Sequence, residues 1–492
     1  MREYRLSKAK ILLGRQCPKR LYLEVHQSEL AEPDEGTEAA FATGHAVGEA
    51  ACRQFPEGIL IGHQDDLALA LKETEAHLAR KEPVTLFEAT FQAEGVLVRC
   101  DVLQRNKAGK LSLIEIKSST EPKPEYNLDV AVQAWVVERA GHKLDSIRLG
   151  YINRDFLYRG KGDYAGLFKY EDMRETVRGL FPGIPVIVLT LQHVLAGKTP
   201  DIAIGKQCFE PYECPFVHHC WPKADYPVIN LPRIGDKVYE LLEEGFTDLR
   251  EVPLERLGTD IQKRVQRVTC SGKSELKLGA KAALKDLAYP RYYLDFETVS
   301  FAVPIWEETH PYEALPFQFS CHVEQQDGTI AHKEFLHDDG TPPMRAFAEA
   351  VIAATGRHGP VLVYSSYEKR ILKALAERFP DLEKPLLAIT ERLVDLLPIT
   401  KQNYYHPAMQ GNWSIKSVLP TIAPELDYEN LDEIRDGGAA STAYLELIAE
   451  GTVAERRQTL RDTLLKYCER DTLAMIEVAR FLQHGKRWNP RR

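Results

Sequence analysis

The chain of 492 residues has no apolar run that approaches the roughly 20 residues of a membrane-spanning helix. Its basic first residues lack both an uninterrupted apolar stretch and a small-residue cleavage site, so we expect no signal peptide. It also has no internal repeat and no low-complexity tract, which excludes a repeat architecture. These absences predict a cytoplasmic protein without a membrane partner.

An excess of basic residues is missing as well: 63 Lys and Arg stand against 72 Asp and Glu, for a net charge of -9. This argues against a generally basic surface that coats nucleic acid regardless of sequence. It does not exclude a nuclease, because carboxylates that hold divalent metals add negative charge and a local groove of Lys and Arg still tracks a phosphate backbone. The length predicts about two to four domains.

The nine cysteines are odd in number, and without an export signal a disulfide framework is not expected. Five of them stand singly in apolar or mixed contexts, and we interpret these as small buried hydrophobic residues: Cys52, Cys100, Cys270, Cys321 and Cys468. The other four stand as one plus three, at Cys17, Cys208, Cys214 and Cys220. Four thiolates suit either a tetrahedral Zn²⁺ or a 4Fe-4S cluster, the adjacent His218 and His219 keep zinc open, and unligated thiols are the third alternative.

Hydrophobic periodicity predicts a helical region over residues 6–50 and three extended segments between 84 and 117. A helix over 128–140 and the strand SIRLGYIN follow. This α-β-β-β-α-β order predicts an α/β domain, for which we expect the bounds 1–225.

Residues 226–290 are predicted to form short helices around glycines, a connector that resembles a helix-hairpin-helix. A second α/β domain is predicted over 291–492. It opens with the strand RYYLDFETVS and continues through FQFSCHVE and AHKEFLH into alternating helices and strands.

A first candidate site lies in the N-terminal domain. Asp101 ends the apolar strand GVLVRC, and Glu115 and Lys117 lie two apart on LSLIEIK, so the period of two aims both side chains at one face. Two carboxylates can bind one or two Mg²⁺ or Mn²⁺ ions, which polarise a phosphodiester and lower the pKa of a bound water. A lysine beside them orients the nucleophile or neutralises developing charge. The pattern predicts phosphodiester hydrolysis.

The order D-(13 residues)-E-I-K is the hallmark of the PD-(D/E)XK nuclease superfamily, and its surroundings resemble the RecB-like branch. Glu88, in LFEATF, stands where that branch carries an upstream acid. Gln133, in VAVQAWVV, resembles the glutamine of its Q-x-x-x-Y helix, although Trp135 is displaced from the usual tyrosine. The resemblance implies a restriction-endonuclease-like fold and metal ligation by Asp101 and Glu115.

Related nucleases of this branch carry a metal-binding histidine in a G-x-x-x-H pattern, where this sequence has GHAVGEAA. Gly48 occupies the histidine position. His45 lies about one helical turn earlier on roughly the same face, so it is either a substitute ligand or a surface histidine.

The cysteine pattern is similar to the cluster domains of AddB and of CRISPR-associated exonucleases. The phrases Cys-Pro-Lys-Arg and C-P-F-x-x-x-C match them, while the spacing from Cys208 to Cys214 is longer than their common C-x-x-C. The resemblance implies a structural 4Fe-4S cluster that holds the two ends of the domain together.

A second candidate site lies in the C-terminal domain, where Asp295 and Glu297 are two apart on an otherwise apolar strand and are poised to share divalent metal. They resemble the D-x-E motif of DEDD exonucleases on the ribonuclease H-like fold. Glu368 stands where the second motif has aspartate. Tyr467 and Asp471 match its Y-x-x-x-D motif, in which the tyrosine hydroxyl orients the attacking water.

Asp395 is a weaker candidate, interpreted as a structural or second-layer acid. The aromatic segment 403–413 either stacks bases or packs as a lid. The whole chain resembles bacterial proteins of unknown function that pair a RecB-like nuclease with a ribonuclease H-like domain. That implies a metal-dependent nuclease for DNA rather than RNA, an exonuclease on single-stranded or end-bearing substrates. The alternative is a nucleic-acid-binding regulatory protein with an inactive C-terminal domain. No protein partner is indicated.

Overall fold

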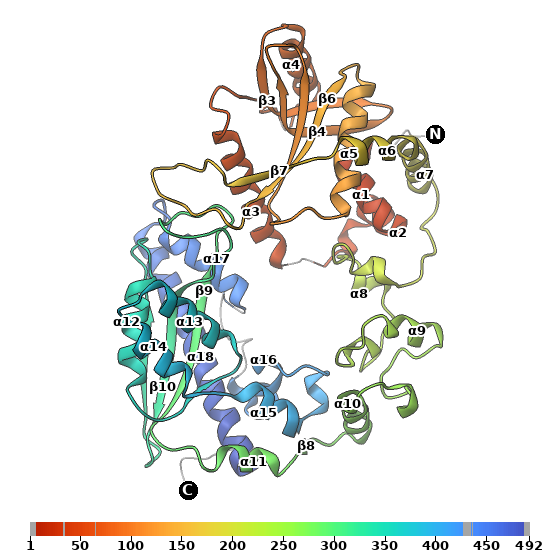
Figure 1. Cartoon of the computed structure of the whole chain (residues 1–492). Helices are drawn as coiled ribbons and strands as arrows, with labels where there is room; N and C mark the ends of the chain where they lie inside the picture. Colours follow the sequence, from red (N-terminus) through yellow and green to blue (C-terminus); the bar gives the residue numbers. More distant parts are fainter. Residues whose placement is uncertain (1–5, 33–34, 64, 427–433, 435, 487–492) are drawn as a thin grey trace. The chain divides into compact units, whose positions relative to one another are not determined.

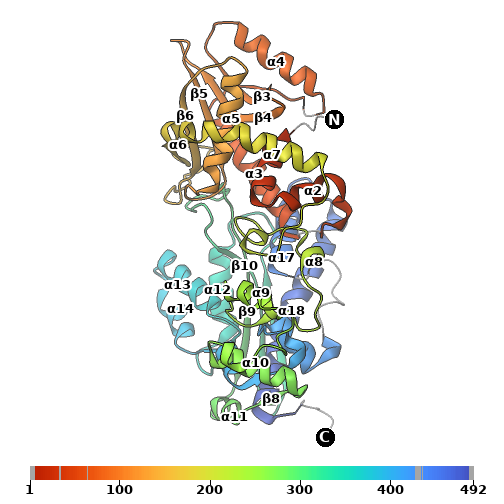
Figure 2. The same ribbon diagram turned by 90° about the vertical axis from the view of Figure 1, so that its right-hand side faces the viewer.

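A computed structural model of the chain describes residues 6–32, 35–63, 65–426, 434 and 436–486 (Figures 1 and 2). The described residues form an α/β protein with mixed sheets, as the sequence predicts. The chain divides into two compact units. Unit 1 comprises Met1–Trp221 and Phe301–Glu313, and unit 2 comprises Pro222–Ser300 and Ala314–Arg492. The segment expected as a connector, 226–290, therefore belongs to unit 2.

Unit 1 is built on a seven-stranded sheet in the order β2-β3-β4-β5-β6-β7, with β1 paired to β4. The antiparallel β3-β4-β5 meander and the parallel β6, reached through helix α5 (Glu125–Arg139), confirm the predicted order of elements. The strands β1, β2 and β7 were not predicted from the sequence. The strands are β1 (Leu6–Ser7), β2 (Ile59–Leu60), β3 (Val84–Ala93), β4 (Val96–Arg105), β5 (Leu111–Lys117), β6 (Leu144–Ile152) and β7 (Phe168–Asp172).

Two apolar cores cover the two faces of this sheet. On one face, α5 packs with Leu86 and Leu113 against residues of five other helices: α1 (Lys8–Gln16), α2 (Pro18–His26), α4 (Leu67–Ala79), α6 (Arg174–Leu180) and α7 (Ile184–Ala196). On the other face, Val47 and Ala50 of α3 (Glu35–Arg53) pack with Ile114. The segment Phe301–Glu313 joins unit 1 through the hydroxyl of Tyr312, which donates to the carbonyl of Ser118.

One helical stretch corrects the expectation drawn from apolar runs. Arg174–Ala196, which spans α6 (Arg174–Leu180) and α7, is long and apolar enough by length and composition to cross a membrane. Core helices of soluble proteins pass the same test. In unit 1 Val188 and Leu191 of α7 are buried, and Leu191 meets Gly14 of α1 so closely that a Cβ there would clash. One side of α7 is therefore a core surface.

Unit 2 contains a five-stranded sheet in the order β11-β10-β9-β12-β13. Strands β9 and β10 are antiparallel, while β12 pairs in parallel with both β9 and β13, and the opening strands confirm the sequence prediction. The strands are β9 (Arg291–Val299), β10 (Leu315–Glu324), β11 (Ile330–Leu336), β12 (Val361–Val363) and β13 (Leu393–Asp395).

Helices cover both faces of the unit 2 sheet (Figures 1 and 2). One face carries α12 (Met344–Thr355), α13 (Tyr367–Arg378) and α14 (Glu383–Thr390), and the other carries the long α18 (Ala454–His484). The ring of Phe296 on β9 meets Phe347 of α12 with centroids 4.9 Å apart. Because strand side chains alternate, Asp295 and Glu297 face α18.

Short helices precede the second sheet, as predicted for 226–290: α9 (Lys237–Glu243), α10 (Asp260–Ser271) and α11 (Gly279–Leu284). Helix α10 begins with a capping box, in which Thr259 and Gln262 bond each other's backbone amides. It ends at Gly272, whose φ of +63° closes the helix in the left-handed region.

The aromatic segment 403–413 is packed. Tyr404, Tyr405 and Trp413 are at most 4% exposed, and Trp413 Nε1 donates to the carbonyl of Tyr404 at 2.8 Å. Rings buried in this way offer no face to a nucleic-acid base. Of the two interpretations of this segment, the packed one holds for these residues.

Candidate metal centres

Two carboxylates of unit 1 stand where strands β3 and β4 change phase. The antiparallel ladder runs along both strands but skips Glu88 and Asp101, which stand opposite each other. Glu88 has φ +56°, in the left-handed region that costs a non-glycine residue about 1–2 kcal/mol. Leu86 and Ala89 both enter the α5-side core, so the alternation shifts by one residue at Glu88. Glu88 and Asp101 consequently belong to neither core.

Glu115 is the centre of a buried polar network. Strand alternation turns it from β5 toward α5, and only 1% of it is exposed. Gln133 Nε2 of α5 donates to Glu115 Oε2 at 2.6 Å. Lys117 Nζ and Lys8 Nζ both donate to Glu115 Oε1, at 2.7 and 2.8 Å. The structure thus brings Glu115, Lys117 and Gln133 together, as the motif predicts.

Two members of this network were not predicted from the sequence. Asp129 of α5 accepts from Lys117 at 2.5 Å and lies 2.9 Å from Lys8 Nζ of α1. Asp129 stands four residues before Gln133, on the same helical face, a spacing that was available in the sequence. Lys8 carries no such signal, because it lies 107 positions from Glu115 and only the folded chain brings it near.

Burial and the charges of the network together shift the pKa values of Glu115 and Asp101 in opposite directions. Burial opposes the ionisation of Glu115, but the ammonium groups of Lys117 and Lys8 outweigh it and lower the pKa of that carboxyl. Burial and the negative charge of Glu115 raise the pKa of Asp101 well above its usual range. Burial also raises the pKa of Glu88. Asp101 and Glu88 therefore gain most from an added cation.

A cavity of about 920 Å³ opens beside these acids in unit 1. Its lining includes Glu88, Asp101, Lys117 and His45, which is exposed on α3. Gly48, which stands in the usual histidine position, also lines the cavity and has open space around it. His45 is therefore a surface histidine, and it also lines the cavity that Glu88 and Asp101 line. Its role as a substitute metal ligand stays a prediction.

The four cysteines of the one-plus-three pattern lie in one region of unit 1. Cys17, Cys208 and Cys214 are buried and Cys220 is half-buried. Gln16, next to Cys17, donates through its side-chain amide to the carbonyls of Gln207 and Tyr212 at 2.8 and 2.6 Å. Burial raises the pKa of the Cys208 thiol, and Cys17 and Cys220 raise it further.

These thiols do not form a compact ligand set. In the part of the chain that the structure describes, the groups of His, Cys, Asp and Glu whose ligand atoms meet within 4.8 Å include none of the four. The amide of Cys214 donates to the carbonyl of Cys208 at 2.8 Å, so this hydrogen bond closes the loop between the two cysteines. The arrangement leaves the choice among a cluster, zinc and unligated thiols as the sequence left it.

The second centre gathers four acids from three elements of unit 2. Asp295 and Glu297 come from β9, Glu368 from the first turn of α13 and Asp471 from the middle of α18. Glu297, Glu368 and Asp471 are each at most 7% exposed. Burial, then the charges of Asp471, Glu297 and Glu368, raise the pKa of Asp295 well above its usual range. All four predicted acids therefore lie within electrostatic range of one another.

Burial, with mutual repulsion of the carboxylates, raises the pKa values of this centre. Burial and the Asp471 charge raise the pKa of Glu297 to about 8, although Lys416 opposes the change. Burial is the largest cause that raises the pKa of Glu368 to about 7, and the Ser365 hydroxyl, which donates to Glu368 Oε2 at 3.2 Å, opposes it. Like charges buried together favour either protons or a bound cation.

Helix α18 adds Tyr467 and Cys468 to this centre. Tyr467 is only 3% exposed. Burial, followed by the charges of Asp471, Glu297 and Asp295, raises the pKa of its phenol, so the hydroxyl lies toward the acids. Cys468 Sγ is 3.7 Å from Asp295 Oδ2. Interpreting Cys468 as a small hydrophobic residue captured its burial but missed this contact with a candidate ligand.

Asp395 lies at the edge of the second centre. Its Oδ1 accepts from the backbone amide of Leu397 at 2.9 Å and so caps α15 (Leu396–Asn403). Its charge also raises the pKa of Glu368. Both facts agree with a structural acid next to the four central ones.

The fold and the two carboxylate centres define an α/β protein with two candidate divalent-metal centres. Residues 292–414 match a family described as Domain of unknown function (DUF2779). That segment holds Asp295, Glu297 and Glu368 and ends before Tyr467 and Asp471.

Two further likenesses are remote. Over 227 residues, 41% of this chain, the sequence is 25% identical to "Uncharacterized protein MG366 homolog" of Mycoplasma pneumoniae (strain ATCC 29342 / M129 / Subtype 1), and the match spans 33% of that protein. The chain thus spans about a third of the length of the curated relative that it matches. A solved structure titled "Crystal structure of SSO0001" is 15% identical, with a TM-score of 0.22, over 44% of this chain and 84% of that one.

Proposed function

We propose that the chain is a metal-dependent nuclease that hydrolyses DNA phosphodiester bonds, acting on single-stranded or end-bearing DNA in the cytoplasm. The observation that carries the proposal is the second centre, where burial and the neighbouring carboxylates, Asp471 among them, raise the pKa values of Asp295, Glu297 and Glu368. Such a set is complementary to divalent cations. The resemblance of both motif sets to nucleases supplies the reaction class.

In this proposal unit 1 is a RecB-like PD-(D/E)XK domain. Asp101 and Glu115 hold the ion, and Glu88 and His45 line the same cavity as Asp101. Gln133 fixes the Glu115 carboxylate by its 2.6 Å hydrogen bond. Lys117, already bonded to Glu115, orients the attacking water or neutralises charge on the scissile phosphate.

Unit 2 is in the same proposal a ribonuclease H-like domain of the DEDD type. Asp295, Glu297 and Asp471 are the metal ligands, and Glu368 takes the place of the usual aspartate. The hydroxyl of Tyr467, one helical turn before Asp471, orients the water. Divalent ions held in these two centres would polarise the phosphodiester and lower the pKa of a bound water.

The residues present fit a divalent ion better in unit 2 than in unit 1. In unit 2 the acids raise one another's pKa, and the cation that acts on Glu297 is Lys416. In unit 1 the ammonium groups of Lys8 and Lys117 already offset the negative charge of Glu115. An ion bound there would mainly stabilise the ionised forms of Asp101 and Glu88. Metal affinity is accordingly expected to be higher in the second centre.

The same proposal gives Cys17, Cys208, Cys214 and Cys220 a structural 4Fe-4S cluster. The hydrogen bonds of Gln16 support this part of the proposal. They link the helix that ends before Cys17 to Gln207 and Tyr212, in the segment that carries the other three cysteines. Closing so long a loop would stabilise unit 1 without adding to the chemistry at Asp101.

The test is cleavage of end-labelled single- and double-stranded DNA and RNA with Mg²⁺ or Mn²⁺. Lys117→Ala and Asp295→Ala each disable one centre, and each should remove one part of the product ladder while DNA binding is retained. Lys10→Ala, which removes a lysine of α1 that lies outside both centres, is the control. If the chain binds DNA and the Asp295→Ala variant behaves as the wild type does, the result supports the regulatory alternative, in which unit 2 is inactive. Undiminished cleavage in the Lys117→Ala/Asp295→Ala double variant would refute the nuclease assignment.

A further inference from the structure

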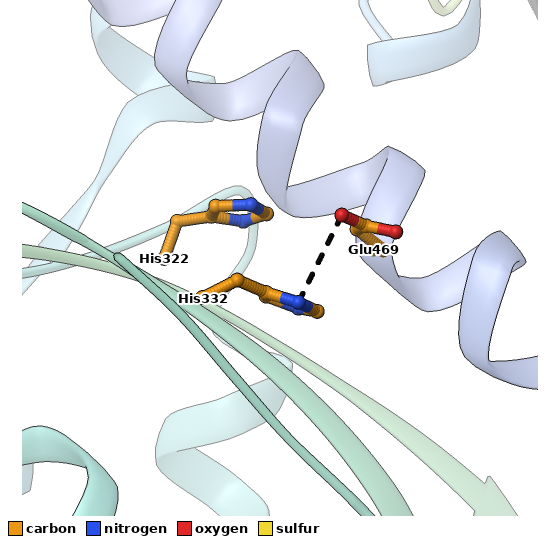
Figure 3. Close-up of side chains that lie close together, drawn as sticks. All are labelled: His322, His332 and Glu469. Atoms are coloured by element: carbon orange, nitrogen blue, oxygen red, sulfur yellow. Dashed lines mark ion pairs between the residues drawn. The ribbon is translucent and has the colours of Figure 1, made fainter. Parts of the chain in front are cut away.

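Two histidines and a glutamate of unit 2 meet on the α18 face of the sheet, beside the second centre. His322 of β10 and His332 of β11 are directly paired across the antiparallel ladder. Their rings stack with centroids 4.4 Å apart and planes inclined by 21°. Glu469 of α18 approaches them, with its Oε1 3.8 Å from His332 Nδ1 (Figure 3). One ligand atom from each of the three lies within 4.8 Å of the others.

A chain of hydroxyls contacts one nitrogen of each ring. Thr472 Oγ1 can give its one hydrogen to the carbonyl of Glu469, 3.0 Å away, and that assignment sets the rest of the chain. In it Thr472 accepts from Ser320 Oγ at 2.7 Å and from His322 Nδ1 at 2.8 Å. Ser320 has then spent its own hydrogen and accepts from His332 Nε2 at 2.9 Å. The lone pairs are left on His322 Nε2 and His332 Nδ1.

This is the arrangement that metal-binding histidines need. Each ring donates one N–H to a fixed oxygen, which sets its tautomer and orientation, and presents the other nitrogen. His332 Nδ1 is also the atom that faces Glu469 Oε1. The hydroxyls of Ser320 and Thr472 thus act as the outer layer of a ligand set formed by two imidazoles and one carboxylate.

We propose that His322, His332 and Glu469 bind one divalent transition-metal ion of the zinc type. Imidazole nitrogens favour Zn²⁺ and its neighbours over Mg²⁺ and Ca²⁺, which take oxygen ligands. The site differs in this chemistry from the second centre, whose grouped ligand atoms are carboxylate oxygens and the Cys468 sulfur. It goes beyond the proposed function, because it requires no nuclease activity and no DNA.

To close on an ion, the three side chains must draw together and the two stacked rings must turn out of their near-parallel planes, because an imidazole lone pair lies in the plane of its ring. With zinc bonds of about 2.1 Å, two ligand atoms of a tetrahedral site lie about 3.4 Å apart. His332 Nδ1 and Glu469 Oε1 are already 3.8 Å apart, and the Glu469 side chain is 41% exposed, so an ion can enter from solvent. Glu334 Oε2, 4.0 Å from His332 Nδ1, or a water can complete the fourth position.

The ion would join α18 to the β10–β11 pair of strands. Glu469 and Thr472 lie three apart on α18, and Tyr467 and Asp471 lie four apart on another face of the same helix. An ion at the histidines therefore fixes the helix that carries Tyr467 and Asp471 without touching either. The expected role is structural.

The test is a Zn²⁺ titration of the full chain by calorimetry, with excess Mg²⁺ present to occupy the carboxylate centres. The wild type should bind one more Zn²⁺ than His332→Ala, and Glu469→Gln should weaken that ion at least about 10-fold to 100-fold. His358→Ala, which removes an exposed histidine elsewhere in unit 2, should bind as the wild type does. All variants retain the cysteines, so zinc bound there cancels in the comparison.

A second readout keeps the result independent of folding. Co²⁺ in the wild type should give visible d–d absorption that is lost in Glu469→Gln, whose side chain keeps its size and lies partly exposed. Circular dichroism should show the same fold for both. Equal Zn²⁺ stoichiometry and affinity in the wild type, His332→Ala and Glu469→Gln would overturn the proposal. Because none of these measurements involves cleavage, their outcome is separate from that of the nuclease assay.

Discussion

Gln133 Nε2 donates to Glu115 Oε2 at 2.6 Å, across 18 positions of sequence, inside a network where Glu115 is 1% exposed. This bond orients a carboxylate that two lysines also contact. A buried charge with three donors is held in one position. In the proposed nuclease, Gln133 is therefore a positioning residue for the Glu115 carboxylate.

Replacing Lys8 tests the network apart from any activity. Lys8→Met leaves Glu115 and Asp129 to share Lys117 as their ammonium partner in the network, so we expect the free energy of unfolding to fall by about 1–3 kcal/mol. Urea unfolding measures this change. Lys10→Met, two positions along the same helix, should change stability by less than about 0.5 kcal/mol. Equal effects of the two substitutions would mean that Lys8 contributes no buried pairing.

Tyr467→Phe tests the proposed role of the phenol in unit 2. The hydroxyl lies toward Asp471, Glu297 and Asp295, and its loss removes only one oxygen from a buried ring. We expect cleavage by unit 2 to slow by about 10²-fold to 10⁴-fold, as on loss of a general acid-base or water-orienting group. Mn²⁺ affinity, measured by calorimetry, should stay unchanged. A variant that cleaves at the wild-type rate would leave Tyr467 a packing residue.

The second centre should make the metal-free protein sensitive to pH. Glu297 and Glu368 have folded pKa values of about 8 and about 7, above the ordinary 4.5. Between the ordinary pKa of 4.5 and these folded pKa values, the folded state thus binds more protons than the unfolded state. Their contribution to stability is fully present below about pH 4.5 and is lost as pH rises through about 7 to 8.

Urea unfolding in a chelator measures this dependence. We expect the free energy of unfolding to fall between about pH 5 and pH 8, and Mg²⁺ to oppose the fall because a bound cation favours the ionised acids. The Glu297→Gln/Glu368→Gln variant should show a shallower decline. Identical slopes for wild type and variant would show that these acids titrate normally.

The cysteine region predicts the colour of the protein. Anaerobically purified chain should be brown, absorb broadly near about 400 nm and carry about four irons. Cys17→Ser should lose the iron and lower the melting temperature of unit 1, whereas Cys270→Ser, at an exposed lone cysteine, should do neither. A colourless wild type with a single zinc would replace the cluster with a tetrahedral zinc site.

Much of the sheet framework was predictable because strand and helix periods are local. β3, β4, β5, α5 and β9 follow their predicted order, and the two-residue spacings of Glu115 with Lys117 and of Asp295 with Glu297 place each pair on one face. The shift of phase at Glu88 was not predictable. It depends on a non-glycine residue in the left-handed region, opposite Asp101.

Several of the contacts that the sequence did not reveal join distant positions of the chain. Lys8 reaches Glu115 across 107 positions, and Cys468 reaches Asp295 across 173. No periodic pattern encodes such distances. His322 and His332 are ten positions apart on strands that were both predicted, but their pairing depends on the register of the turn between them, which polar spacing alone does not fix.

The most direct test of the central claim is a product ladder from end-labelled single-stranded DNA. With Mg²⁺ or Mn²⁺ the wild type should shorten the strand progressively, and a chelator should stop it. The Glu115→Gln/Asp295→Asn double variant should bind the same DNA and leave it intact, because both substitutions remove a ligand charge with little change in shape. Cleavage by the double variant at the wild-type rate, or a wild type that binds DNA and never cuts it with either metal, would contradict the account.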